Sequence, residues 1–443
     1  MNQSATEPVT FAPPMSLPLA VDFQGGRLTS DGGWAWVAEA DAALDLCATL
    51  AASLPDHRRR RGRHTVLDLV RQRIYQIAAG YADQNDADAL RSDPLLKLVC
   101  GRLPEGDPDL ASQPTFSRFE NACSTRDCYR LAEALAEIYL RERERIGRPT
   151  HIVLDFDGTD DPTHGAQEGS AYHGYFRQQM YHPLLVFDGE TGQLITAILR
   201  PGTAHAGHGA LAILRRIVAR LRARWPQVTI ELRADAGFAK PEIYAFCEAE
   251  AISYTIGLVT NPRLVALAAS LAEAAMTRSR QQNGAKVRLL GEAVYQAGSW
   301  ERPRRVIIKA EVLAKGLNTR FVVTSRSDDP DHLYAWYTAR GETENWIKDL
   351  KHACFADRLS CHRFRANQMR LLLHAAAYTL LDTLRRWLVA AGSERLSLET
   401  LRLRLIKIGG RVRHLATHLH LRLASSHPGE PLWHLLAVRE GRL

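Results

Sequence analysis

The order of predicted elements between residues 151 and 258 is the feature that most constrains the fold of this chain. Three apolar runs rich in β-branched and aromatic residues come first, which is typical of strands: HIVLDFD, MYHPLLVFD and QLITAILRPGT. A helix, a strand, a helix and a strand are then predicted in turn: 208–226, 228–238, 240–251 and 253–258. The resulting order is β-β-β-α-β-α-β.

This order predicts an α/β fold of the ribonuclease-H-like type, a mixed five-stranded sheet with flanking helices. Such a fold ends with one more helix, and here the helix is delayed. Residues 259–326 contain three strand-like runs and predict a mainly β insertion: 286–297, 304–313 and 320–325. The delayed helix then follows at 332–353.

The flanking segments have other patterns. Apolar residues recur at helical spacing along 64–81, and the whole of 31–147 is expected to be an α-helical N-terminal domain. A flexible arm is expected at 1–30, before this helical domain at 31–147. The core then has its first part at 151–258, the β insertion at 259–326, and its last helix with the helix after it at 327–391. A basic C-terminal region follows at 392–443.

Composition excludes several classes of protein. The chain has 443 residues, 46% of them hydrophobic and 24% charged, as in ordinary soluble globular proteins. No apolar run is long enough to cross a bilayer, and the N-terminus has no secretory pattern. Seven scattered cysteines without a Cys-x-x-Cys motif argue against disulfide frameworks and zinc ribbons. We expect a cytoplasmic, nucleoid-associated protein with no membrane partner.

Basic residues gather in four separate segments. Lys and Arg number 57 against 49 Asp and Glu, a formal charge of +8. The segments are 57–64, 216–225, 302–305 and 402–414. One charge run is usually a solvated face, but four of them favour a polyanion, because neutralised phosphates release counterions. The candidate DNA-binding residues in the densest segment are Arg58, Arg59, Arg60 and Arg61.

The segment SQPTFSRFENA is a second candidate for DNA binding. Ser112 is a plausible N-cap, and Gln113, Thr115 and Arg118 lie in the first turns of the helix that would follow. Small polar residues and Arg at a helix start are what a DNA-reading helix presents to a groove. Any capped surface helix presents them too, so both interpretations stay open.

Three carboxylates are expected to meet at one edge of the predicted sheet. Asp157 ends the first strand, Asp235 ends the fourth strand beside it, and Glu344 lies on the last helix. An oxygen-only group of this kind suits a hard cation, and we expect magnesium, with manganese as a substitute. Two such ions can activate a water or a 3′-hydroxyl and stabilise the leaving oxygen of a phosphodiester.

The first aspartate has a competitor. Asp155 lies two residues before Asp157 and therefore faces the same side of the strand. We favour Asp157 as the ligand because it is nearer the strand end, with Asp155 as a partner that supports it.

The last helix carries a further group of polar residues. Tyr337, Arg340, Glu344 and Lys351 follow one another at spacings of three, four and seven residues, which keeps them near one helix face together with Lys348. Such a face suits a DNA backbone beside a metal centre. The alternative is a solvated face with incidental ion pairs.

These motifs resemble those of a known family. YTARGETENWIKDLK fits the pattern Tyr-x2-Arg-x3-Glu-x6-Lys at every spacing. Further resemblance lies in DFDGTDDPTHGAQEG, RPGTAHAGHGA, LRADAGFAKPEIY, LTSDGGWAW, GYADQNDADALRSDP and SQPTFSRFEN. The chain resembles bacterial insertion-sequence transposases of the Asp-Asp-Glu superfamily, in the Tyr-Arg-Glu-Lys branch, and within it the insertion-sequence family numbered thirteen-eighty.

The resemblance implies a function. It implies binding to terminal inverted repeats and to target DNA, magnesium-dependent strand cleavage and strand transfer, and a homodimer in a synaptic complex. Asp157, Asp235 and Glu344 would be the catalytic triad.

Two other functions are candidates for the same sequence: a phosphatase and a non-catalytic DNA-binding protein. In a phosphatase of the haloacid-dehalogenase type, Asp155 would be the nucleophile, but the segment FVVTSRSDDPD offers Thr324 with no lysine before its acidic cluster. A non-catalytic DNA-binding protein on a transposase scaffold stays open, since a triad alone does not prove activity.

Overall fold

The computed structural model describes residues 9–11, 19–58 and 62–441 of the chain. The expected arm therefore lies partly outside the described residues, as do Arg59, Arg60 and Arg61. The chain forms two compact units, each assembled from separated segments. The first unit comprises Met1–Ala43, Gly62–Ser117 and Leu380–Leu443, and the second comprises Leu44–Arg61 and Arg118–Thr379. A division into consecutive domains along the sequence does not anticipate this interleaving.

The first unit is mainly helical. Its helices include α1 (Trp34–Leu44), α3 (Val66–Ala78), α4 (Asp86–Leu90), α5 (Pro94–Val99), α15 (Leu398–Leu401) and α16 (Glu430–Arg439). Its strands are β1 (Val9–Phe11), β2 (Leu19–Val21), β3 (Leu28–Thr29), β15 (Gly410–His414) and β16 (Leu419–Leu423), in the orders β1-β2 and β16-β15-β3. Buried polar contacts tie distant segments together: Trp34 Nε1 donates to the Tyr75 carbonyl at 3.0 Å, and Lys407 pairs with Asp31 at 2.7 Å.

An eight-stranded mixed sheet forms the centre of the second unit, in the order β12-β13-β14-β11-β10-β4-β8-β9. The strands first in the chain are β4 (His151–Gly158), β8 (Leu184–Asp188) and β9 (Leu194–Ile198), which pair antiparallel. β10 (Thr229–Ala234) pairs parallel with β4, and β11 (Ser253–Leu258) pairs parallel with β10. Parallel pairing brings the carboxyl ends of β4 and β10 to the same edge of the sheet.

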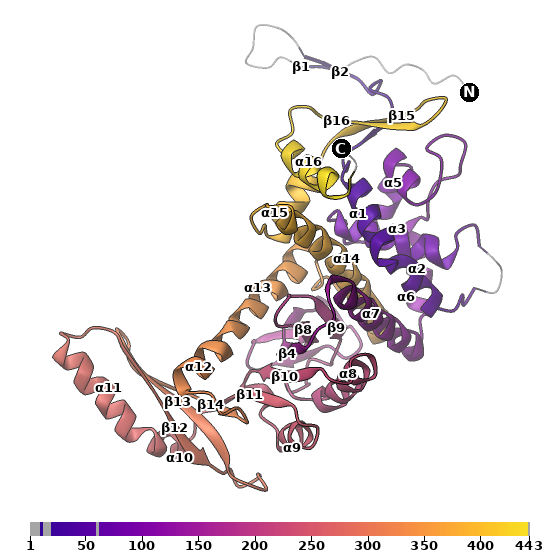
Figure 1. Ribbon diagram of the computed structural model, residues 1–443. Helices are drawn as coiled ribbons and strands as arrows, with labels where there is room; N and C mark the ends of the chain where they lie inside the picture. The colour runs from indigo at the N-terminus through magenta and orange to yellow at the C-terminus, as the bar shows by residue number, and fades with distance from the viewer. Residues whose placement is uncertain (1–8, 12–18, 59–61, 442–443) are drawn as a thin grey trace. The chain divides into compact units, whose positions relative to one another are not determined.

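Helices cover this part of the sheet (Figure 1). They are α7 (Thr125–Ile146), α8 (Ala210–Arg224) and α9 (Pro241–Ala249), and α2 (Leu46–Ser53) packs on α7. α7 begins at a capping box in which Ser124 and Asp127 bond to each other's backbone N–H groups. The apolar stripe of α8, with Leu214, Ile217 and Leu221, joins the core cluster that also contains the β4 and β10 side chains.

The insertion extends the central sheet beyond the five expected core strands, because its three strands continue the sheet from β11, which the sequence did not predict. β14 (Gly316–Thr324) pairs antiparallel with β11, and β13 (Arg304–Leu313) and β12 (Val287–Tyr295) follow outward. β11 would otherwise expose a row of unpaired backbone groups, which β14 satisfies. The insertion also contains α10 (Pro262–Leu267) and α11 (Ala269–Gln281), and α11 lies along the β12–β13 ribbon (Figure 1).

The last helix is not one regular helix over 332–353. It consists of α12 (Pro330–Thr338), a 3₁₀ turn Ala339–Gly341, α13 (Glu342–Lys348) and a π-helical turn Asp349–Ala353. Asp329 caps its start by accepting from the N–H groups of Asp331 and His332. The changes in winding alter which side chains share a face, so spacing alone does not place them.

The described chain also contains α6 (Gln113–Ala122), α14 (Phe364–Ala390), the 3₁₀ turn Ala236–Phe238 and a π-helical turn Arg402–Ile406. A small antiparallel sheet consists of β5 (Asp161–Pro162), β7 (Gln178–Tyr181) and β6 (Ala171–His173). Among the described residues, no helix is both long and apolar enough to span a membrane.

Candidate active site

Asp157 and Asp235 lie at the same edge of the central sheet. Asp157 is the last residue but one of β4, and the residue is 7% exposed. Asp235 directly follows β10, whose residue Ala234 pairs with Phe156 of β4. Asp235 Oδ1 accepts from the Gly237 N–H at 2.8 Å, which starts the 3₁₀ turn after the strand. The pairing of β4 with β10 is therefore what brings these two carboxylates together.

Asp157 is buried and lies near two other carboxylates, Asp235 and Glu344. The pKa of Asp157 is raised to about 7, chiefly by burial, with the charges of Asp235 and Glu344 adding to the rise and Arg340 opposing it. A carboxyl with such a pKa is half protonated near neutral pH. Any positive charge that approaches this edge therefore strengthens its own binding by ionising Asp157.

Arg340 supplies one such positive charge. Its Nη2 atom donates to Oδ2 of Asp157 at 2.9 Å from the 3₁₀ turn between α12 and α13. Burial is the largest influence on the pKa of Arg340 and lowers it, but Asp157, Tyr337, Asp235 and Asp155 together outweigh burial and hold the pKa above its usual value. The guanidinium thus partly neutralises the negative charge of Asp157 and Asp235.

Glu344 lies in the first turn of α13 and is exposed. Its charge reaches Asp157, but no group of three or more His, Cys, Asp or Glu side chains in the described part of the chain is placed to hold a metal ion together. A triad that converges on one cation stays a prediction. The donor set nevertheless fits a hard divalent cation, because it consists of carboxylate oxygens, the ligands that such cations prefer.

Asp155 has a different environment from Asp157. It is 1% exposed, and both carboxylate oxygens accept from Arg233, each at 2.7 Å. Thr343 Oγ1 donates to the same carboxylate at 3.2 Å, and Arg233 also donates to the Trp336 carbonyl at 3.0 Å. Asp155 therefore holds α12 and α13 against the sheet, with no oxygen free of a protein donor.

Sequence reasoning missed Arg233 and Thr343. A signal for Arg233 was present, because it stands two residues before Asp235 and so faces the same side of its strand. Thr343 directly precedes Glu344, but a single threonine gives no pattern that marks it.

Three residues of the last-helix motif contact the sheet edge. Besides Arg340, the Tyr337 hydroxyl lies 3.5 Å from the Ala234 carbonyl, and burial, opposed by Arg340 and helped by Asp235, raises the pKa of Tyr337 to about 12. Lys351 Nζ donates to Oδ1 of Asp160 at 2.9 Å and to the Asp160 carbonyl at 3.0 Å. Lys348 is exposed on α13. The face is thus only partly solvated.

The predicted DNA-binding residues of the N-terminal segments are placed less distinctively. Arg58 is engaged by Asp56 through two hydrogen bonds of 2.7 Å. Gln113 and Thr115 are partly buried in the first turn of α6, and Arg118 is exposed further along it. These positions neither support nor oppose contact with DNA.

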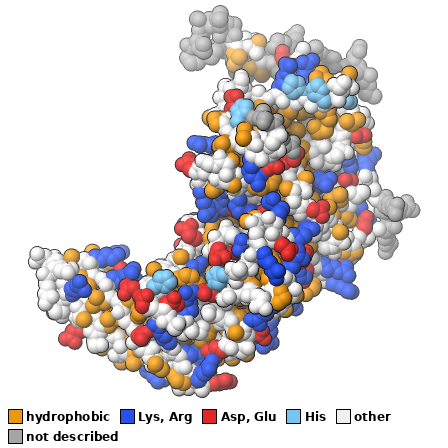
Figure 2. Space-filling view, viewed as in Figure 1, with side chains coloured by type: hydrophobic (Ala, Val, Ile, Leu, Met, Phe, Trp, Pro, Cys, Tyr) orange, Lys and Arg blue, Asp and Glu red, His pale blue; other side chains and the backbone are white. Residues whose placement is uncertain are grey.

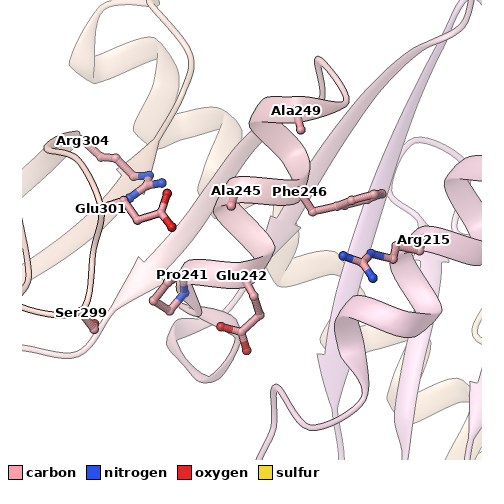
Figure 3. Close-up of a pocket in the computed structure, with 9 residues that line it drawn as sticks. All are labelled: Arg215, Pro241, Glu242, Ala245, Phe246, Ala249, Ser299, Glu301 and Arg304. Carbon is pink, nitrogen blue, oxygen red and sulfur yellow. The ribbon is translucent and has the colours of Figure 1, made fainter.

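A pocket of about 520 Å³ lies elsewhere in the second unit (Figure 3). It is lined by α8, α9 and the loop before β13, and none of the predicted site residues lines it. Arg215 and Phe246 stand on one side, and Glu301 and Arg304 on the other (Figure 3). Its mixed charges show no preference for a particular ligand.

Comparisons with known proteins agree with the motifs. The chain matches the family model described as "Transposase DDE domain group 1" over residues 11–440. No curated protein matches the chain. A structure of the piggyBac transposase synaptic complex with hairpin DNA matches 86% of this chain and 81% of that chain at 12% identity, with a TM-score of 0.42.

The Mos1 transposase paired-end complex with left transposon end matches 69% of this chain and 82% of that chain at 11% identity, with a TM-score of 0.18. A pre-cleavage Mos1 transpososome matches 68% and 82% at 12% identity, with the same TM-score of 0.18. The family model covers nearly the whole sequence. The chain belongs to the family of transposases with a DDE domain of group 1.

Proposed function

We propose that this protein is the DNA transposase of an insertion sequence, which binds terminal inverted repeats and performs metal-dependent strand cleavage and strand transfer. The observation that carries the proposal is the parallel pairing of β4 with β10, which brings Asp157 and Asp235 to one edge of the sheet in a chain of the transposase family. The strands β9, β8, β4, β10 and β11 would be its ribonuclease-H-like core. Membership of the Tyr-Arg-Glu-Lys branch and of the family numbered thirteen-eighty is part of the proposal.

Asp157, Asp235 and Glu344 are the residues that would hold divalent cations, magnesium in the cell and manganese as a substitute. Two bound ions would supply an activated water or 3′-hydroxyl and a stabilised leaving oxygen at the phosphodiester. The chain's own contribution is the geometry of the edge: β4 and β10 fix two carboxylates, and the Asp155 contacts with Arg233 and Thr343 fix the helix that carries the third.

The cationic side chains would position the DNA strand. Arg340 can exchange its contact with Asp157 for a phosphate, to which its planar guanidinium can donate two parallel hydrogen bonds. Tyr337 is a neutral hydrogen-bond donor at neutral pH, as any tyrosine with a pKa of 10 or more is, and it can donate to a phosphate oxygen. Lys348 and Lys351 would contact phosphates further along the same strand.

The phosphatase alternative fits the structure poorly. A phosphorylated aspartate must be reachable by the substrate's phosphorus, and Asp155 is 1% exposed with both oxygens accepting from Arg233. Its burial instead supports a positioning role.

DNA is the proposed partner, in the form of inverted repeats and target duplex, with the transposase acting as a homodimer in the nucleoid. The basic segments support a polyanionic partner through counterion release. On the face in view, Lys and Arg side chains are spread among acidic ones, not gathered in one patch (Figure 2). We assign recognition of the repeats to the N-terminal region, with Arg58, Gln113, Thr115 and Arg118 among its contacts.

The test uses the full chain, magnesium and a labelled duplex carrying the repeats that flank the gene. Glu344→Gln should abolish strand cleavage and leave end binding intact, because it removes a metal-binding charge. Glu342→Gln is the matched control, since Glu342 is also exposed on α13 but lies two residues away. Robust nicking by Glu344→Gln, or an equal loss in Glu342→Gln, would overturn the assignment.

A further inference from the structure

The hairpin formed by β6 and β7 carries an exposed tyrosine at its turn. Tyr175 is 84% exposed, and its ring meets the Phe176 ring edge to face, with centroids 5.0 Å apart. The turn is held by a 2.7 Å hydrogen bond from the Arg177 N–H to the His173 carbonyl, with Arg177 in the left-handed region at a φ of 56°. A ring on such a fixed turn loses little conformational freedom when a ligand binds to it.

Tyr175 is the outer end of a row of rings that leads to the candidate site. Phe176 packs on His173 at 5.1 Å and on His182 at 5.8 Å, and the two histidine rings are 5.2 Å apart. We name Tyr175, Phe176, His173 and His182 the aromatic row. A Cβ atom at Gly158, the neighbour of Asp157, would lie 2.8 Å from His182 Nε2. The inner end of the row therefore touches the strand end that carries Asp157.

A second connection ties the hairpin to the last-helix motif. Gln178, at the start of β7, donates to Oδ2 of Asp160 at 2.9 Å, and Lys351 donates to Oδ1 of the same aspartate at 2.9 Å. The hairpin is thus fastened both to β4 and to the segment that would contact the DNA backbone. Arg177, two residues from Tyr175 on the same turn, is an exposed cation.

We propose that Tyr175, backed by the aromatic row, is a stacking platform for an unpaired base of the DNA strand next to the cleaved phosphodiester. The inference rests on the proposed function and names a substrate feature, unpaired DNA, that this function does not require. A base inside a duplex is covered on both faces by its neighbours, so an isolated protein ring can stack only on a base that has left the helix. A positive charge beside an exposed ring is the combination that holds single-stranded DNA.

The experiment measures DNA binding alone, in the absence of divalent cations, so that it does not depend on cleavage. The probes are a single-stranded oligo(dT) of about 20 nucleotides with a central 2-aminopurine, and a blunt duplex of the same length. Tyr175→Ala should weaken binding of the single strand by about 5- to 150-fold and restore 2-aminopurine fluorescence, because stacking on the ring is lost. Duplex affinity should change less than twofold, and Tyr175→Trp should bind the single strand at least as well as wild type.

Tyr172→Ala is the matched control. Tyr172 is also exposed, at 61%, but it neighbours His173 in β6 and therefore points to the opposite face of the hairpin. The platform would be overturned if Tyr175→Ala binds the single strand within twofold of wild type, or if wild type does not bind the single strand at all. It would also be overturned if Tyr172→Ala loses as much single-strand affinity as Tyr175→Ala, or if Tyr175→Ala loses as much affinity for duplex as for the single strand. If Tyr175-dependent binding is found but the wild type never cleaves repeat ends, the cleavage proposal fails and the platform stands.

Discussion

Arg340 donates a hydrogen bond from Nη2 to Oδ2 of Asp157 at 2.9 Å, although the two residues are 183 apart in the sequence. The contact joins the 3₁₀ turn between α12 and α13 to the end of β4, so the arginine of the last-helix motif lies against the first carboxylate of the proposed triad. A guanidinium placed there balances charge that divalent cations would balance in a loaded site. Under the proposed function, bound cations would free the same side chain to contact a phosphate.

Arg340→Lys tests this role, because it keeps the charge but removes the planar pair of donors. Single-turnover nicking of a pre-assembled complex should slow by more than about tenfold, while end binding changes little, since misplacement of a phosphate by about 1 Å can cost on the order of 100-fold. Arg278→Lys, an exposed arginine on α11, is the matched control and should nick normally. A nicking rate within about threefold of wild type for Arg340→Lys, under 1 kcal/mol, would contradict the positioning role.

The raised pKa of Asp157 predicts a pH dependence of stability. The folded-state pKa is about 7 and the unfolded value is near 3.8, so the folded protein binds more protons between these values. Stability contributed by this group is therefore present at low pH and lost as pH rises from about 4 to 7, by at most about 1.4 kcal/mol per pH unit.

Denaturant unfolding of wild type and Asp157→Asn at several pH values measures this contribution. The substitution should raise the free energy of unfolding at pH 8 relative to wild type and have a smaller effect at pH 5. Magnesium should raise the stability of wild type at pH 8 and leave Asp157→Asn unchanged. Parallel pH profiles for the two proteins would show that Asp157 is ionised normally in the fold.

DNA recognition can be divided between the two N-terminal groups of residues. Replacing the arginines at 58–61 with Ala should weaken binding to every sequence and flatten the dependence on salt, by up to about 0.9 in log–log slope per arginine that contacts a phosphate. Replacing Gln113, Thr115 and Arg118 with Ala should instead reduce the preference for repeat over random duplex. A fragment without residues 1–147 that still prefers the repeat in a gel-shift assay would refute this division.

Local sequence patterns anticipate the element order of the core well. The predicted β-β-β-α-β-α-β order matches β4, β8, β9, α8, β10, α9 and β11, because each element has its own apolar period and its own turn residues. The sequence also places Asp157 and Asp235 at strand ends. Their meeting at one edge then follows from the parallel pairing of β4 with β10.

Local sequence patterns do not predict which distant segments pair with one another. Nothing in the apolar run of β14 indicates that it pairs with β11 and enlarges the sheet, because edge pairing depends on which backbone groups are left unpaired in three dimensions. The 3₁₀ turn at Ala339–Gly341 contains one helix-disfavouring residue, Gly341, and a single glycine does not predict a change of winding. The partners of Asp155 are equally non-local, since Arg233 and Thr343 lie 78 and 188 residues away.

Asp155 and Arg233 form a buried pair whose loss should be structural before it is catalytic. Both side chains are at most 3% exposed, so Asp155→Asn leaves a buried guanidinium with a neutral partner, and we expect a loss of about 3 kcal/mol in unfolding free energy. Asp155→Asn with Arg233→Met should recover part of that loss, because no buried charge remains. At a temperature where both variants are folded, Asp155→Asn should nick repeat ends faster than Asp157→Asn, since only Asp157 is proposed to hold metal. The reverse order of nicking rates would identify Asp155 as the ligand.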